Sequence, residues 1–278
     1  MIRKNSLNLG GKEKMKTDLL TKFHPFTLSL LRIVAGFLFW QRGMQKLFGL
    51  FGGEVAPTFS LLWSAGVLES LGGPLIALGL LTRPVALVLA GEMATAYWIV
   101  HRPQGFWPLR NGGEVALLFL IIFLCLVTFG PGKIAVDAVM SKRFSGEALF
   151  DSLRPVTLNL LRIFTGILFW QHGASKFGLL GGRMREFPDL SFFAGVLEFF
   201  GGPLIALGAF TQPVAFILSG EMAYAFWFSH VPRGPAFWPV QNGGELAVLF
   251  CFIYLFLVAA GPGRFSVDGL LRKKFSKG

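Results

Sequence analysis

Eight apolar segments alternate with short polar connections along the chain. They lie near residues 27–48, 59–81, 84–100, 113–130, 157–178, 190–210, 213–229 and 244–261. A bilayer core about 30 Å thick needs roughly 20 helical residues, and an open sheet edge cannot be satisfied in lipid. The pattern therefore predicts an all-α polytopic membrane protein with eight transmembrane helices, of which the third in each group of four is short.

The second half of the chain repeats the first at a spacing of about 130 residues. LLRIVAGFLFWQ at 30–41 returns as LLRIFTGILFWQ at 160–171, and GGPLIALG at 72–79 returns at 201–208. GEMA at 91–94 and NGGE at 111–114 return at 220–223 and 242–245. Because each copy holds an even number of helices, both copies enter the membrane from the same side. The fold expected is two parallel four-helix bundle repeats.

Charge divides the chain further and predicts its orientation. We expect a basic N-terminal tail at 1–26, the first repeat at 27–143, a linker at 144–156, the second repeat at 157–271 and a basic C-terminal tail at 272–278. Lys and Arg are about twice as frequent on the side of the termini, which the positive-inside rule places in the cytoplasm. The first 25 residues lack the apolar stretch of a cleavable signal peptide.

Composition supports lipid as the solvent and excludes several other classes. Of 278 residues, 53% are hydrophobic and 15% are charged, whereas soluble proteins carry about 25% charged residues. The net charge of +11 does not indicate nucleic-acid binding, because the basic residues sit at segment ends. Cys125 and Cys251 lie singly in apolar runs, so neither a dithiol centre nor a cysteine metal site is expected.

Ionisable residues inside the apolar segments are the first candidates for function, because charge is costly in a bilayer. At 1.5 Å per helical residue, Arg32 lies roughly 8 Å and Glu92 roughly 12 Å in from the same side. We expect a buried ion-pair network in which Arg32 pairs with Glu92 or Glu69, and a counterpart in the second copy. Two roles remain open for this network. It could fix the register of the helices, or it could relay protons or bind a ligand. The network comprises Arg32, Glu69, Glu92, Arg162, Glu198 and Glu221.

A second polar set lies where helices one, three and four of each copy meet the opposite side of the membrane. It comprises Lys46, His101, Trp107, Asn111, Glu114, Lys176, His230, Trp238, Asn242 and Glu245. His, Lys and Trp could donate hydrogen bonds to a quinone ring or a lipid headgroup, and a His there could pass a proton. The alternative is a loop that caps the bundle, with the Trp residues in an interfacial belt. Haem ligation by His101 and His230 has little support, and no metal site is expected.

These motifs resemble a known family. LLRIVAGFLFWQRGMQKLFG, followed by GVLE, GGPLIALGLLT, GEMA and NGGE, is similar to the DoxX family of bacterial membrane proteins. Each half of the chain resembles one whole DoxX unit, so the tandem form departs from the usual single unit. The resemblance implies a four-helix bundle in the bacterial inner membrane. It also implies a link to respiratory redox chemistry, because the family takes its name from membrane subunits of a thiosulfate:quinone oxidoreductase.

Three functions follow as competing hypotheses. The first is a membrane subunit linked to quinone chemistry that receives electrons from a soluble or periplasmic redox protein, since the chain has no nucleotide-binding fingerprint. The second is a transporter or channel for a small solute or protons, built between the repeats. The third is a scaffold without catalytic activity that assembles other membrane or periplasmic proteins. No residue is assigned a catalytic role, and quinone is the one cofactor considered.

Overall fold

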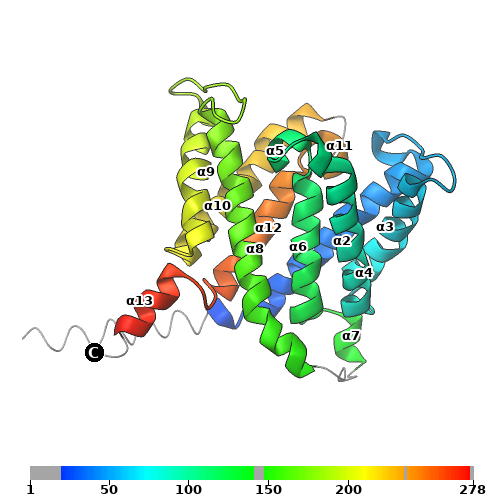
Figure 1. Ribbon diagram of the computed structural model, residues 1–278, viewed down its shortest axis with the longest axis horizontal. Helices are drawn as coiled ribbons and strands as arrows, with labels where there is room; N and C mark the ends of the chain where they lie inside the picture. The colour runs from blue at the N-terminus through cyan, green and yellow to red at the C-terminus, as the bar shows by residue number, and fades with distance from the viewer. Residues whose placement is uncertain (1–19, 141–146, 235–236, 276–278) are drawn as a thin grey trace, which may run out of the picture.

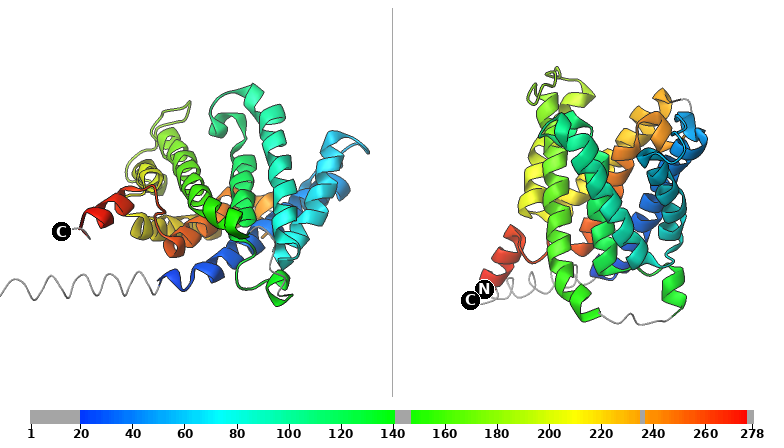
Figure 2. Two further views of the ribbon diagram at one scale, coloured as in Figure 1. Left: turned by 60° about the horizontal axis from the view of Figure 1, so that its bottom comes forward. Right: turned by 45° about the vertical axis from the view of Figure 1, so that its right-hand side comes forward.

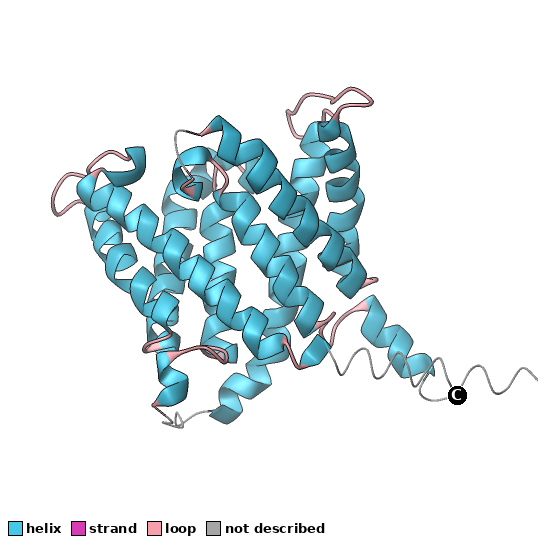
Figure 3. Ribbon diagram, turned by 180° about the vertical axis from the view of Figure 1, so that it is seen from behind, coloured by secondary structure: helices cyan, strands magenta, loops and turns pink. Residues whose placement is uncertain are grey.

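The computed structural model describes residues 20–140, 147–234 and 237–275, and all regular structure in these ranges is helical (Figure 3). Four long helices form the first repeat: α2 His24–Phe48, α3 Leu61–Leu78, α4 Thr82–Ala96 and α6 Glu114–Phe129. Their counterparts in the second repeat are α8 Glu147–Lys176, α9 Leu190–Leu207, α10 Thr211–Tyr224 and α12 Glu245–Ala260. The expected all-α architecture is confirmed for the described residues.

Short helices complete each repeat at the two ends of the bundle. α5 Pro108–Asn111 and α11 Pro239–Asn242 precede the fourth long helices, and α7 Val136–Val139 and α13 Val267–Phe275 follow them. π-helical turns at Tyr97–His101 and Ala225–His230 extend α4 and α10. Figure 1 places α5 and α11 at one end of the bundle and α7 and α13 at the other. These are called the α5 end and the α13 end below.

Local sequence explains where the helices begin and end. The Ser60 hydroxyl accepts a hydrogen bond of 3.1 Å from the Trp63 amide and caps α3, as hydroxyl side chains do at helix N-termini. α3 ends at Gly79, whose φ of +71° suits glycine in a left-handed cap. α4 then starts with Thr82-Arg83-Pro84, where proline in the first turn sacrifices no hydrogen bond. The second repeat uses Gly208 in the same way, with φ of +70°.

Within each repeat the first two long helices pack backbone to backbone. A Cβ atom built on Gly73 would lie 2.6 Å from the Trp40 amide nitrogen, and one on Gly36 would lie 2.6 Å from the Gly73 carbonyl oxygen. Gly166 and Gly202 make the same close crossing in the second repeat. Small residues that let helices approach closely are typical of membrane bundles.

The two repeats face each other through their first and fourth long helices. α6 packs against α8, and α12 packs against α2, which Figure 1 and Figure 2 show from several directions. Aromatic side chains fill the interior of each repeat: the Phe39 ring lies 4.9 Å from those of Phe119 and Phe123. In the second repeat, Phe169 lies 5.1 Å from Phe250.

Length and composition identify three helical segments that could cross a membrane in the described part of the chain. They are Leu61–Leu78, Thr82–Gln104 and Leu190–Leu207. α6 and α12 are apolar but shorter, at 16 residues each. Eight spans therefore stay an expectation at this point.

Two helices extend into segments that were expected as a linker and a tail. α8 begins at Glu147 and contains Pro155, so residues 147–156 of the expected linker are helical. A proline inside a helix removes one hydrogen bond, and tertiary packing can offset that loss. Residues 272–275 of the expected C-terminal tail belong to α13. Residues 1–19, 141–146 and 276–278 lie outside the described ranges.

Candidate functional site

The buried arginines of α2 and α8 bind backbone carbonyl groups. Arg32 is 0% exposed. Its Nε donates to the Pro131 carbonyl oxygen at 2.8 Å, and its Nη1 donates to Ala77 at 2.6 Å and to Ile76. Its Nη2 donates to the Ile134 carbonyl. The predicted pairing of Arg32 with Glu69 or Glu92 is wrong. The guanidinium donates instead to carbonyl groups at the end of α3, which have no backbone partner within the helix.

Arg162 repeats this arrangement and corrects its predicted pairing with Glu198 or Glu221. Its Nη1 donates to the carbonyls of Ile205 at 2.8 Å and Ala206 at 2.5 Å, and its Nη2 donates to Phe265 at 2.6 Å. Each arginine therefore ties the end of the second helix of its repeat to the turn after the fourth. Cations near helix C-termini are favourable, so these arginines stabilise the fold.

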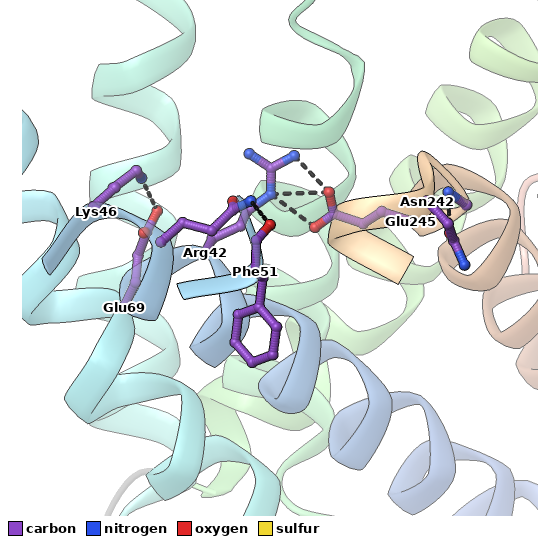
Figure 4. Close-up of polar contacts among 8 residues, drawn as sticks. Arg42, Lys46, Phe51, Glu69, Asn242 and Glu245 are labelled. Atoms are coloured by element: carbon purple, nitrogen blue, oxygen red, sulfur yellow. Dashed lines mark hydrogen bonds and ion pairs between the residues drawn. The ribbon is translucent and has the colours of Figure 1, made fainter. Parts of the chain in front are cut away.

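The carboxylates of the predicted network have other partners. Lys46 on α2 forms an ion pair with Glu69 on α3, and Figure 4 shows the two side chains meeting between these helices. Lys176 on α8 forms the equivalent ion pair with Glu198 on α9. The Glu69 side chain is 1% exposed. A buried carboxylate needs such a partner, because leaving it unpaired is strongly destabilising.

Glu92 and Glu221 complete the carboxylate set from the third helix of each repeat. Neither oxygen of either carboxylate has a hydrogen-bond partner among the described residues, although all four oxygens are buried. Glu69 and Lys46 are the charged groups that act on Glu92, and Glu198 and Lys176 act on Glu221. Each repeat therefore holds one cation and two carboxylates close together, with the second carboxylate unsatisfied.

Contacts between basic and acidic side chains join the two repeats beside these groups. Arg42 on α2 binds Glu245 on α12 with two nitrogens, Nε at 2.7 Å and Nη2 at 2.5 Å (Figure 4). His172 Nε2 on α8 lies 2.9 Å from a carboxylate oxygen of Glu114 on α6. Arg42 and His172 follow the same FWQ motif in the two copies. The repeats thus exchange their helix-four carboxylates, and neither basic partner was predicted from the sequence.

The predicted set at the α5 end separates into unlike parts. His101 Nδ1 lies 3.0 Å from the Asn111 carbonyl oxygen. The Asn111 side chain donates to the Gly105 carbonyl at 3.0 Å and accepts from the Gly113 amide at 2.8 Å. These contacts close the loop before α6. Glu114 binds His172 across the repeats, so its expected convergence with Lys46 and His101 is wrong.

The second copy of this loop is built in the same way. The Asn242 side chain donates to the Phe237 carbonyl at 3.3 Å and accepts from the Gly244 amide at 2.9 Å, and His230 interacts with the Asn242 backbone. The tryptophans reach across the repeats. The Trp107 ring lies 6.1 Å from Trp170, and the Trp238 ring lies 5.2 Å from Phe51. The loops support the alternative of a bundle cap.

Two glutamines that were not predicted from the sequence as site residues belong to this region. Gln41 and Gln171 are both 0% exposed. Gln171 Oε1 accepts from the Leu109 amide of the first repeat at 3.2 Å, while its Nε2 and both polar atoms of Gln41 have no partner among the described residues. Buried amides without partners are rare in native proteins. The FWQ motif in both copies was the signal that could have found them.

The carboxylate cluster consists of two separate sets, Lys46, Glu69 and Glu92 in the first repeat and Lys176, Glu198 and Glu221 in the second. Its carboxyl groups can hold and release protons. No group of three His, Cys, Asp or Glu side chains in the described ranges could bind a metal ion. A cavity of about 660 Å³ opens at the α13 end, lined by residues that include Leu28, Arg83, Phe129 and Arg154. It lies away from the cluster.

Comparisons with known proteins match each half of the chain separately. A model of the DoxX family matches residues 27–102 and again 157–231. A Haemophilus influenzae protein is 41% identical over 130 residues, which cover 45% of this chain and 97% of that protein. An uncharacterized membrane protein of Mycobacterium tuberculosis is 30% identical and 84% covered, using 43% of this chain. A Bacillus subtilis protein named "Putative oxidoreductase CatD" is 28% identical and 86% covered, using 41% of this chain. No solved structure matches.

Proposed function

This chain belongs to the DoxX family of membrane proteins, and we propose that its carboxylate cluster exchanges protons with a quinone in membrane redox chemistry. The observation that carries the proposal is the pair Glu92 and Glu221, buried carboxylates without hydrogen-bond partners among the described residues. An ionised carboxylate in this position is costly in lipid. A protonated one is neutral and gains an O–H donor.

A protonated Glu92 or Glu221 has the chemistry that a quinone carbonyl needs. The O–H group donates a hydrogen bond to the carbonyl oxygen and transfers its proton as the ring is reduced. Reduction of one quinone to quinol takes up two protons and two electrons. Each repeat offers one such acid on its own third helix, so an acid that serves one quinone must take up a new proton between the two transfers, and a soluble redox partner protein would deliver the electrons. The ion pairs Lys46–Glu69 and Lys176–Glu198 lie beside the acids. Their ammonium groups favour the carboxylate that remains after proton transfer, and their carboxylates oppose it.

The proposal includes the arrangement in the membrane. Two parallel repeats, 27–143 and 157–271, would supply eight spans in a bacterial inner membrane, with both termini in the cytoplasm. The carboxylate cluster would then lie in the outer half of the bilayer. A reporter fused after Gly278 should be active only in the cytoplasm, and one inserted within 102–110 only outside. A periplasmic C-terminus would overturn the orientation.

The quinone hypothesis is tested with carboxylate variants. We expect Glu92→Leu with Glu221→Leu to weaken quinone binding to purified protein by a few-fold to roughly 10-fold, because a neutral acid hydrogen bond contributes about 0.5–1.5 kcal/mol. Glu54→Leu, at an exposed loop position, is the matched control. Mass spectrometry of bound quinone and titration calorimetry measure the effect. Unchanged binding in the double variant would sink the proposal.

Transport is the second candidate function. The Arg42–Glu245 and His172–Glu114 contacts join the parallel repeats beside the carboxylate cluster, and repeat interfaces are where transporters place their sites. Proton-linked solute flux into liposomes that is lost in Glu92→Gln with Glu221→Gln, without quinone binding in the parent protein, would favour transport. Assembly of partner proteins without either activity would favour a scaffold.

A further inference from the structure

α13 is held to the bundle through its first turn. The two carboxylate oxygens of Asp268 accept hydrogen bonds from the amides of Phe210 at 2.8 Å and Thr211 at 2.9 Å. The Asp268 amide donates to the Gly208 carbonyl at 2.9 Å. These contacts fix the start of α13 at the turn between α9 and α10, at the α13 end of the bundle. These hydrogen bonds therefore fix the position of the start of α13 along the long axis of the bundle.

Beyond this clamp, α13 runs outward from the bundle, as Figure 1 and Figure 2 show. Leu270 is 66% exposed and Leu271 is 47% exposed. The 3.6-residue period places Val267, Leu270 and Leu271 on one face, with Arg272 and Lys273 on the opposite side. Lys274 lies within the apolar face, where its long stem can follow apolar surface while its charge reaches water.

The surroundings of α13 indicate what covers this face. Phe210, beside the Asp268 clamp, is 69% exposed, and Phe265, just before the helix, is 64% exposed. Basic residues accompany these apolar side chains: Arg264 before the helix and Arg272, Lys273 and Lys274 within its last turn. A helix with an apolar face and a Lys- and Arg-rich polar face lies in the plane of a membrane interface.

The first repeat carries the same clamp with a different continuation. Asp137 accepts from the amides of Leu81 and Thr82, each at 2.8 Å. α7 then ends at Val139, which is 84% exposed, before residues outside the described ranges. Both copies thus place an apolar turn at the same level of the bundle. Only the second copy extends it, within the described residues, into a helix with a basic last turn.

We propose that α13 lies in the membrane–water interface as a docking helix for anionic lipid. Val267, Leu270 and Leu271 enter the acyl region, and Arg272 and Lys274 bind lipid phosphates. The charge argument selects anionic lipid over zwitterionic lipid, because each basic residue near such a surface adds to binding. The inference depends on the chain being a membrane protein and not on its activity.

Spin labels on the full-length protein test the position of the helix. Leu270→Cys and Leu271→Cys are compared with Arg272→Cys and Lys273→Cys, in a background of Cys125→Ala and Cys251→Ala, in nanodiscs containing phosphatidylglycerol. Labels at 270 and 271 should be more accessible to oxygen than to a water-soluble nickel chelate, and labels at 272 and 273 should show the reverse. Equal accessibility at all four positions, or immobilisation that depends on protein concentration, overturns the proposal.

Lipid binding by the protein with its native cysteines gives a second test. This test remains valid if the protein with Cys125→Ala and Cys251→Ala folds poorly. Arg272→Gln with Lys274→Gln should bind phosphatidylglycerol at least about fivefold more weakly than the parent protein, since one basic residue corresponds to about that factor. Phosphatidylcholine binding should not change. The control with equal charge loss is Arg183→Gln with Arg185→Gln, exposed residues in the loop before α9. Equal losses in both double variants overturn the assignment to α13.

Discussion

At the scale of single residues, burial of a charge does not identify its partner. Arg32 and Glu69 are both almost fully buried, yet the arginine binds carbonyl oxygens and the carboxylate binds Lys46. A guanidinium carries five donors. The end of α3 supplies carbonyls that no backbone amide reaches. Arg32 thus has a structural role, and Glu92 is left with neither carboxylate oxygen hydrogen-bonded among the described residues.

The carbonyl-bound arginine predicts a specific pattern of stability. Arg32→Leu should lower the free energy of unfolding by about 3 kcal/mol or more, because several carbonyls lose charged donors worth about 1.5–3 kcal/mol each. Adding Glu92→Leu should not restore that loss, since Glu92 is not its partner. Thermal unfolding in mild detergent measures both variants, with the exposed Arg185→Leu as control. Rescue by Glu92→Leu would contradict the contacts described here.

At the scale of elements, the positions of the helices and their repetition were predictable from the sequence, whereas the packing partners of each helix were not. Apolar length, the Thr82-Arg83-Pro84 turn and the recurrence of GGPLIALG located the helices to within a few residues. Such signals are local. α8 begins at Glu147, inside the segment expected as a linker, because a proline within a helix is a weak boundary when packing supports it.

The crossing of α2 and α3 predicts opposite effects for two glycines. Gly73→Ala should destabilise by about 1–3 kcal/mol, because its Cβ would lie 2.6 Å from the Trp40 amide nitrogen and backbone must move. Gly91→Ala, on α4, meets no atom within 4 Å and should be neutral or stabilising by up to about 1 kcal/mol. Thermal unfolding of the two variants side by side gives the comparison. Equal stability of the two would argue against a tight α2–α3 crossing.

At the scale of the whole molecule, the repeats complete one another. Arg42 and His172 occupy the same position in the two copies, and each pairs with the helix-four carboxylate of the other copy. Sequence alone favoured partners inside one repeat, since nothing local tells whether Glu114 faces its own copy or the other. The same exchange between repeats explains why Trp107 and Trp238 pack against aromatic rings of the other repeat and not within the pockets expected in their own.

The reciprocal contact predicts that charge reversal on one repeat is repaired only from the other. Arg42→Glu places two carboxylates together and should lower the free energy of unfolding by about 2 kcal/mol, and with it the unfolding temperature. The loss stays moderate because the Arg42 side chain is 32% exposed and its charge is partly screened by solvent. Combining Arg42→Glu with Glu245→Arg should recover most of the loss. Combining it with Glu114→Arg, the equivalent residue of the same repeat, should recover none, because Glu114 lies against His172. Thermal unfolding of the three variants separates these outcomes, and rescue by Glu114→Arg would reject the exchange of carboxylates between repeats.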